Sequence, residues 1–172
     1  MKIILLGYMA SGKSTIGKLI AKEYKLQFVD LDDYIEQKEQ KTIPEVFKDN
    51  GEIYFRKKET EYLIELLNKK EDFVLSLGGG TPCYGNNMEH IKLAEGVCSV
   101  YLKANSNTIV ERLKKEKENR PLVAELNDED LLEFVAKHLF ERNYYYNMAH
   151  FKVKIDNKSI DEICNETYSL LT

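Results

Sequence analysis

The sequence predicts an α/β fold in which a parallel sheet is covered by helices on both faces. Three observations lead to this prediction. Short apolar runs of strand length alternate with longer amphipathic runs along the chain. A glycine-containing loop, Gly7–Gly12, stands between the first apolar run and the first helical one. The length of 172 residues suits one domain, and strands that are separated by helices join through right-handed crossovers into a parallel sheet.

The spacing of apolar residues places each element along the chain. Strands are predicted at residues 2–7, 27–30, 73–77, 97–102 and 151–155. Helices are predicted near residues 13–24, 32–38, 43–69, 87–94, 106–116, 128–147 and 159–171, the third of them broken around Asn50-Gly51. The last helix begins with a capping box, Ser159-x-x-Glu162. In such a sheet, ligands bind at the carboxyl ends of the strands, so chemistry is expected just after each strand.

The composition excludes several classes of function. A net charge of −4 argues against a general nucleic-acid-binding surface. No apolar run approaches the roughly 18 residues that a membrane span requires. Cys83, Cys98 and Cys164 lack motif spacing, which indicates reduced thiols and neither a disulfide frame nor a zinc site. We therefore expect a cytoplasmic, monomeric protein that acts on small molecules.

The first strand leads into a match to the P-loop pattern G-x-x-x-x-G-K-[ST], between Gly7 and Ser14. Glycines let the backbone approach phosphate oxygens, and the helix N-terminus presents partial positive charge to them. Lys13 suits the β- and γ-phosphates and the Ser14 hydroxyl suits Mg²⁺. The predicted nucleotide contacts are Ala10, Ser11, Gly12, Lys13, Ser14 and Thr15. The alternative is a glycine-rich turn with an exposed lysine, but the strand–loop–helix context favours the P-loop.

Polar or flexible residues follow the second and third strands as well. Asp30 and Asp32 come at the end of the second strand, where they could hold Mg²⁺ through water and accept a proton from a hydroxyl. They could equally be acids that complement a helix dipole, which is the role expected for Asp33. The third strand ends in Ser76 and Leu77 and runs into Gly78-Gly79-Gly80, which indicates either a close backbone approach or a flexible turn.

Two arginines stand on helix faces that should point inward. Arg56 shares a stripe with Glu59, Leu63 and Leu67, and Arg142 shares one with Val135, Leu139 and Tyr146. A buried guanidinium must be paired. Glu59 can pair with Arg56 at i+3, whereas Arg142 has no acid on its own stripe. Arg142 either reaches the surface or a distant acid, or it binds an anionic substrate.

A highly charged stretch, residues 111–122, ends in Arg120-Pro121-Leu122 and cannot be core. It is either a solvated loop or a lid that closes over the phosphates. On a closing lid, Arg120 would supply positive charge during phosphoryl transfer.

The motifs together resemble the shikimate kinases, small P-loop kinases of aromatic amino-acid biosynthesis. The resemblance is carried in order by Gly12-Lys13-Ser14-Thr15, Asp30-x-Asp32-x-x-Ile35-Glu36, Gly51-Glu52-x-x-Phe55-Arg56-x-x-Glu59, Gly78-Gly79-Gly80, Arg120-Pro121-Leu122 and Arg142-x-x-x-Tyr146. The resemblance implies a three-layer P-loop fold with five parallel strands in the order 2-3-1-4-5. It also implies one kinase domain, with a substrate-binding helical region at about residues 32–60 and a lid at about residues 113–126.

The resemblance further implies the roles of individual residues. Shikimate would be bound by Asp32, Arg56, Gly79 and Arg142, and Asp32 would act as the base. Lys13 and Arg120 would neutralise the transferring phosphate, Ser14 would bind Mg²⁺, and Asp30 and Ser76 would lie in its water shell. Glu59 would fix Arg56. Arg112 and the loop at residues 156–158 are candidates for the adenine contacts.

The implied reaction is phosphoryl transfer from MgATP to the 3-hydroxyl of shikimate. One alternative is another small-molecule P-loop kinase, such as a gluconate or nucleoside-monophosphate kinase. The paired inward arginines favour a carboxylate substrate, and the triple glycine with Arg56 and Glu59 favours shikimate over gluconate. A second alternative is a silent nucleotide-binding regulator, which would be expected to lack Lys13, Asp32 or Arg120, and all three are present.

Overall fold

A computed structural model describes residues 1–116, 123 and 125–171. Within them, one parallel five-stranded sheet has the order β2-β3-β1-β4-β5. This is the order expected from the family resemblance. The strands are β1 (Lys2–Leu6), β2 (Gln27–Asp30), β3 (Phe73–Ser76), β4 (Val97–Lys103) and β5 (Phe151–Lys154). Each begins and ends within two residues of its predicted position.

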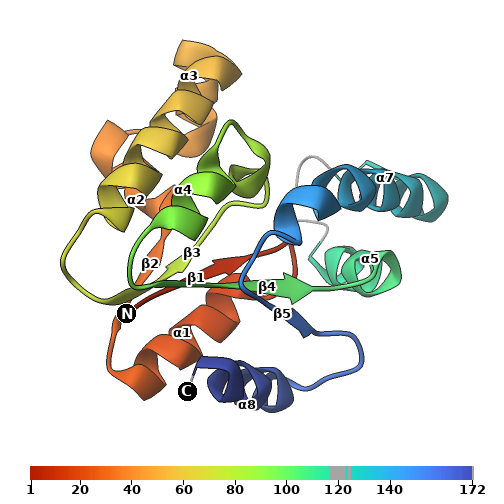
Figure 1. Cartoon of the computed structure of the whole chain (residues 1–172). Helices are drawn as coiled ribbons and strands as arrows, with labels where there is room; N and C mark the ends of the chain where they lie inside the picture. Colours follow the sequence, from red (N-terminus) through yellow and green to blue (C-terminus); the bar gives the residue numbers. More distant parts are fainter. Residues whose placement is uncertain (117–122, 124, 172) are drawn as a thin grey trace.

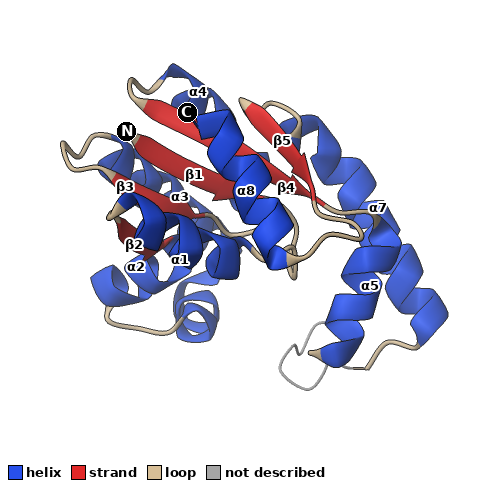
Figure 2. Ribbon diagram, turned by 90° about the horizontal axis from the view of Figure 1, so that it is seen from below, coloured by secondary structure: helices blue, strands red, loops and turns tan. Residues whose placement is uncertain are grey.

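Helices cover both faces of this sheet, as the sequence predicts. They are α1 (Lys13–Tyr24), α2 (Leu31–Glu39), α3 (Ile43–Leu67), the 3₁₀ helix η1 (Thr81–Cys83), α4 (Asn87–Leu93), α5 (Ser106–Lys115), α7 (Asp128–Tyr146) and α8 (Ile160–Leu171). In Figure 1, α1 and α8 lie below the sheet and α3, α4 and α7 lie above it. Figure 2, seen from below, shows α1 and α8 running across the strands. No helix among the described residues is long and apolar enough to cross a membrane.

Local sequence signals set the ends of the helices. Thr42 and Glu45 form a capping box at the start of α3, because each side chain bonds the other residue's backbone N–H. The capping box predicted at Ser159 and Glu162 is present in the same form. The predicted break in α3 falls at Gly51, whose φ of 82° and ψ of 174° are not helical.

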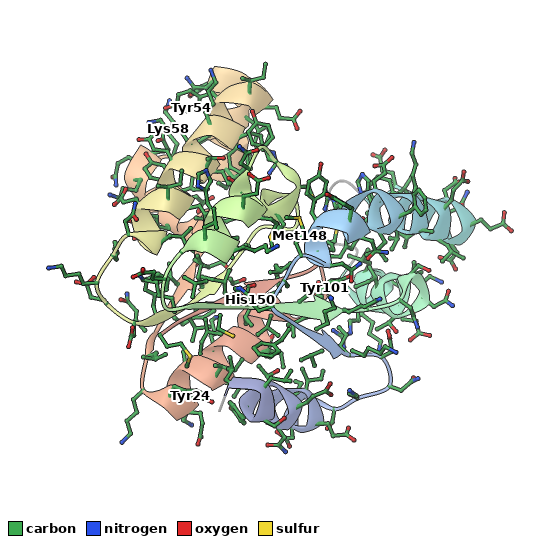
Figure 3. The ribbon with its side chains drawn as sticks, viewed as in Figure 1. Tyr24, Tyr54, Lys58, Tyr101, Met148 and His150 are labelled. Carbon is green, nitrogen blue, oxygen red and sulfur yellow. The ribbon has the colours of Figure 1, made fainter. Side chains whose placement is uncertain are left out.

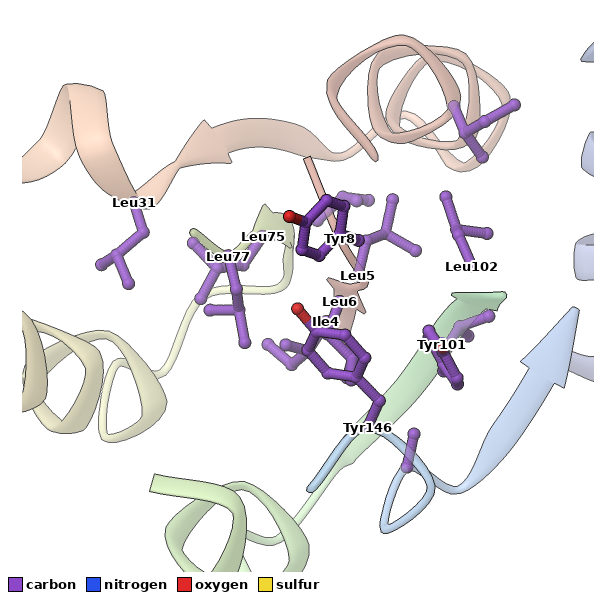
Figure 4. Packing of buried hydrophobic residues seen from close by; sticks show 14 of the residues in the cluster. Ile4, Leu5, Leu6, Tyr8, Leu31, Leu75, Leu77, Tyr101, Leu102 and Tyr146 are labelled. Carbon is purple, nitrogen blue, oxygen red and sulfur yellow. The ribbon is translucent and has the colours of Figure 1, made fainter. Parts of the chain in front are cut away.

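The core surrounds the central strand. Every residue of β1 is buried, as are the apolar side chains that α1, α3 and α7 turn towards the sheet. Figure 4 shows part of this cluster, including Tyr8 and Tyr146. Strand register then aligns the polar strand ends, because Ser76 of β3 pairs with Leu5 of β1 on one side and with Asp30 of β2 on the other. The P-loop, Asp30 and the triple glycine therefore lie together at the carboxyl ends of the strands.

Candidate functional site

The P-loop wraps around the side chain of Lys13. The Lys13 ammonium donates to the carbonyls of Gly7 and Tyr8 at 3.0 and 2.9 Å. Gly7 is required here, because a Cβ at its φ of 148° would lie 2.8 Å from the carbonyl oxygen of Leu102. The Ser11 hydroxyl is buried and has no hydrogen-bond partner among the described residues. A buried unpaired donor beside a helix N-terminus fits an anion such as phosphate.

A cavity of about 560 Å³ opens beside this loop. It is lined by residues 9–16 together with Asp30, Asp32, Ser76, Leu77, Gly78, Gly79, Arg112, Glu116, Ile160 and Ile163. The predicted nucleotide contacts from Ala10 to Thr15 thus share one cavity with Asp32 and Gly79. Arg112 reaches over the loop and donates to the carbonyl of Ala10 at 3.1 Å.

Asp30 connects the P-loop to α2. One of its carboxylate oxygens accepts from the Ser14 hydroxyl at 3.1 Å, and the other accepts from the backbone N–H of Asp32 at the start of α2. Asp30 therefore caps α2, as the helix-acid alternative expects, and it also lies beside the Ser14 hydroxyl. A hydroxyl with nearby carboxylates is an oxygen donor set that suits Mg²⁺, which keeps waters and phosphate oxygens as its other ligands.

The carboxylate of Asp32 faces the cavity from the first turn of α2. Desolvation of the carboxyl group, followed by the charges of Asp30 and Glu59, raises the pKa of Asp32 to about 6, while Lys13 opposes the rise. Gly78 leaves room for this carboxylate, since a Cβ there would lie 3.4 Å from an Asp32 oxygen. A carboxylate with a pKa close to neutrality suits a group that accepts a proton.

Arg56 is paired within the chain. Its guanidinium donates to Glu59 at 2.8 Å, and Glu59 is only 1% exposed. The other oxygen of Glu59 accepts from the Thr81 hydroxyl at 2.6 Å, so the carboxylate is held from two sides. A Cβ on Gly80 would lie 2.6 Å from the guanidinium of Arg56. Glycine at this position lets Arg56 lie against the backbone of the triple-glycine loop.

Arg142 is held differently. Among the described residues, no carboxylate forms an ion pair with it. Its guanidinium carbon lies 5.5 Å from the centre of the Tyr8 ring. A Cβ on Gly79 would come within 3.3 Å of the guanidinium, and the carbonyl of Gly79 accepts from the Tyr146 hydroxyl at 2.6 Å. The triple-glycine loop therefore lies between Arg56 and Arg142.

The structure supports the predicted stripes. Leu63 and Leu67 on α3 are buried, as are Val135, Leu139 and Tyr146 on α7, so both arginines do point inward. Arg120, Pro121 and Leu122 lie outside the described residues, as does part of the predicted lid at 113–126. Asp156, in the loop named as a candidate for the adenine contacts, accepts from the backbone N–H of Asn105 and the hydroxyl of Thr108 at the start of α5.

Two residues of the site were missed by sequence reasoning. Tyr8 occupies a variable position of the P-loop pattern, and its contacts with α7 join residues about 130 positions apart. Thr81 follows the triple glycine directly and bonds a carboxylate on α3. A polar residue next to three glycines was the only available signal for Thr81, and Tyr8 offered none.

Comparisons with known proteins agree with this geometry. A family model described as "Shikimate kinase" matches residues 9–172. The chain is 49% identical to a shikimate kinase of Flavobacterium psychrophilum, over 99% of this chain and 98% of that one. The crystal structure of shikimate kinase from Bacteroides thetaiotaomicron superposes with a TM-score of 0.90 at 32% identity, covering 99% and 98% of the chains. Shikimate kinase from Acinetobacter baumannii in complex with shikimate gives 0.83 at 32% identity, covering 99% and 92%.

Proposed function

Because this chain belongs to the shikimate kinase family, we propose that its cleft brings ATP and shikimate together for transfer of the γ-phosphoryl group to the 3-hydroxyl. The protein is a phosphotransferase that forms shikimate 3-phosphate and ADP in aromatic amino-acid biosynthesis. The observation that carries the site assignment is the pair of inward arginines, which lie against Gly80 and Gly79 of the triple-glycine loop, while Gly79 and Asp32 line the cavity beside the P-loop. Of the two, Arg142 has no counter-charge among the described residues.

We assign the shikimate carboxylate to Arg56 and Arg142. Guanidinium groups bind planar carboxylates through two parallel hydrogen bonds, which fixes orientation as well as position. The backbone of Gly79 lies against Arg142, so it would contact the same end of the substrate. With its carboxylate held there, the ring of shikimate would extend towards Asp32 and the P-loop.

Asp32 is proposed to orient the reacting hydroxyl and to accept its proton. Its carboxylate lines the same cavity as the P-loop, and its raised pKa keeps it basic enough to take a proton as the bond to phosphorus forms. Phosphoryl transfer depends mainly on positioning and on charge stabilisation, so a modest base is sufficient.

The charge of the transferring group is assigned to Lys13 and Arg120. Lys13 lies inside the P-loop, and Arg120 would approach on a lid at about residues 113–126. Ser14 is the proposed ligand of Mg²⁺, with Asp30 and Ser76 in its water shell. Mg²⁺ held there would offset the negative charge of the phosphate groups. The apolar side chains of Ile160 and Ile163, together with Arg112, are proposed to contact the adenine.

The remaining proposals concern organisation. We propose one domain whose helical region, residues 32–60, binds shikimate. Tyr54 and Tyr62 of α3 both donate to Glu39 of α2, which joins these helices into one unit. Tyr54 and its neighbour Lys58 lie together on α3 (Figure 3). A monomer in the cytoplasm is proposed from the unpaired thiols and the absence of any motif for a larger assembly in the sequence.

An ADP-release assay over several acceptors tests this assignment. The acceptors are shikimate, gluconate and a nucleoside monophosphate at equal concentration, with ATP alone as the baseline. We expect turnover with shikimate to exceed the others by at least about a hundredfold, because the nucleotide has no carboxylate for the arginines and the flexible chain of gluconate does not hold a hydroxyl at a fixed distance from its carboxylate. Turnover with gluconate or the nucleotide that equals turnover with shikimate would contradict the assignment.

A further inference from the structure

Tyr8 lies at the junction between the P-loop and the substrate side of the cleft. Its side chain is 1% exposed, although it belongs to a loop that lines an open cavity. The ring faces the guanidinium of Arg142 at 5.5 Å, and the hydroxyl lies 3.0 Å from Nδ1 of His138, one turn earlier on α7. Figure 4 shows Tyr8 among the buried residues around β1.

The ring of Tyr8 gives the charge of Arg142 a favourable neighbour. A cation without a carboxylate partner needs another favourable environment, and the face of an aromatic ring provides one within about 6 Å. The ring does not neutralise the charge, so the guanidinium remains able to bind an anion. A carboxylate in the place of the ring would compete with the substrate.

The orientation of the Tyr8 ring is itself fixed. Burial raises the pKa of Tyr8 to about 12, so the hydroxyl is neutral. Burial and the charge of Arg142 lower the pKa of His138, so its imidazole is neutral and can share the hydrogen bond. His138 also packs edge-on against Tyr8, with ring centres 6.1 Å apart. The ring therefore has one preferred position beneath Arg142.

We propose that Tyr8 is a positioning residue for shikimate binding, which acts by holding Arg142 in the orientation that receives the carboxylate, with His138 fixing the Tyr8 ring. This inference rests on the proposed role of Arg142. It connects the two halves of the site, because the carbonyl of the same Tyr8 accepts from Lys13. A purely structural Tyr8 would instead support the P-loop and affect ATP at least as much as shikimate.

The test compares KM values for the two substrates in Tyr8 variants. Tyr8→Leu removes the ring, and we expect the KM for shikimate to rise about tenfold while the KM for ATP changes less than about twofold. Tyr8→Phe keeps the ring and loses only the hydroxyl, so a rise of about threefold or less is expected. If Tyr8→Leu does not fold, Tyr8→Met fills the same space without an aromatic face.

Tyr101→Phe is the matched control. Tyr101 is also 1% exposed, and its hydroxyl donates to Asn143 of α7, so the variant removes a similar hydrogen bond to the same helix. Both KM values should stay within about twofold of the parent. A selective rise in the KM for shikimate in this control would show that any loosening of α7 has the effect, and would overturn the proposal.

A double variant separates this inference from the function on which it rests. In the Arg142→Ala background, Tyr8→Leu should add less than about twofold to the KM for shikimate, because its effect passes through Arg142. An additive effect, an equal rise in the KM for ATP, or an unchanged KM for shikimate in Tyr8→Leu would each overturn the inference alone. An unchanged KM for shikimate in Arg142→Ala would instead overturn the proposed role of Arg142.

Discussion

Arg56 and Arg142 approach the triple-glycine loop from different helices, and the chain surrounds them in different ways. Arg56 on α3 is bonded to Glu59, which is held in turn by Thr81. Arg142 on α7 has an aromatic ring and a glycine backbone as its neighbours and no carboxylate among the described residues. The charge of Arg56 is therefore paired with a carboxylate before any substrate binds, whereas the charge of Arg142 is not paired with one among the described residues.

This difference suggests a division of work. The ion pair fixes the direction of Arg56 but reduces the charge that it offers to a ligand. Arg142 keeps its full charge, so it should contribute most of the attraction for a carboxylate, while Arg56 contributes mainly to its orientation. The predictions that follow test this division.

The largest effect is expected from Arg142→Ala. Removing the uncompensated guanidinium should raise the KM for shikimate about a hundredfold and leave the KM for ATP nearly unchanged. The melting temperature should change little, because the variant leaves no described carboxylate without its partner. Steady-state kinetics with each substrate varied in turn measures the first effect, and a thermal melt measures the second.

Arg56→Ala should have a smaller effect on the KM for shikimate than Arg142→Ala and a larger effect on stability. The KM for shikimate should rise about tenfold, whereas unfolding should become easier by about 2–3 kcal/mol because the buried Glu59 loses its cation. Adding Glu59→Gln should recover part of this stability, since the amide carries no charge. Equal melting temperatures for Arg56→Ala and Arg142→Ala would contradict the division.

Glu59 also links Arg56 to Asp32, the proposed base. The charge of Glu59 is one of the causes that raise the pKa of Asp32 to about 6, after burial and Asp30. We therefore expect kcat/KM for shikimate to fall below about pH 6 in the parent, as Asp32 takes up a proton. Glu59→Gln should move this fall to lower pH. Thr81→Val, which removes a hydrogen bond without changing charge, should leave its position nearly unchanged.

The raised pKa of Asp32 also predicts how the stability of the fold depends on pH. The pKa of Asp32 is raised from 3.8 unfolded to about 6 folded, so the folded state binds the proton more tightly and this group destabilises the fold above about pH 6. Asp32→Asn should melt at a higher temperature than the parent at pH 7, and the difference should disappear as the pH falls below about 4. Its turnover should fall about a thousandfold. A lower melting temperature for the variant at pH 7 would contradict the raised pKa.

The smallest effects are expected in the triple-glycine loop. Gly80→Ala places a methyl group 2.6 Å from Arg56, whereas Gly79→Ala places one 3.3 Å from Arg142. Both contacts are with the far ends of long side chains, which can shift slightly, so the KM for shikimate should rise only about fivefold and twofold respectively. A larger effect of Gly79→Ala would show that Arg142 is held more rigidly against the loop than Arg56 is.

Much of this site could be predicted because its signals are local. The P-loop is a continuous pattern, Glu59 is one helical turn from Arg56, and Gly51 breaks a helix by its own backbone freedom. The neighbours of Arg142 were not predictable in this way. Tyr8 lies just after β1 and contacts α7, which is about 130 residues away in the sequence. This contact depends on how α7 packs on the sheet, which no local pattern in the sequence indicates. The prediction for Arg120 lies outside the described residues and stays a prediction.

The most direct test of the central claim is a binding cycle between Arg142 and the carboxylate of shikimate. Calorimetry would measure shikimate and its methyl ester, which lacks the negative charge, against the parent and Arg142→Ala. We expect esterification to weaken binding about a hundredfold in the parent and no more than about tenfold in the variant, because only Arg56, already paired with Glu59, is left to bind the charge. An equal loss in both proteins would show that Arg142 does not bind the carboxylate.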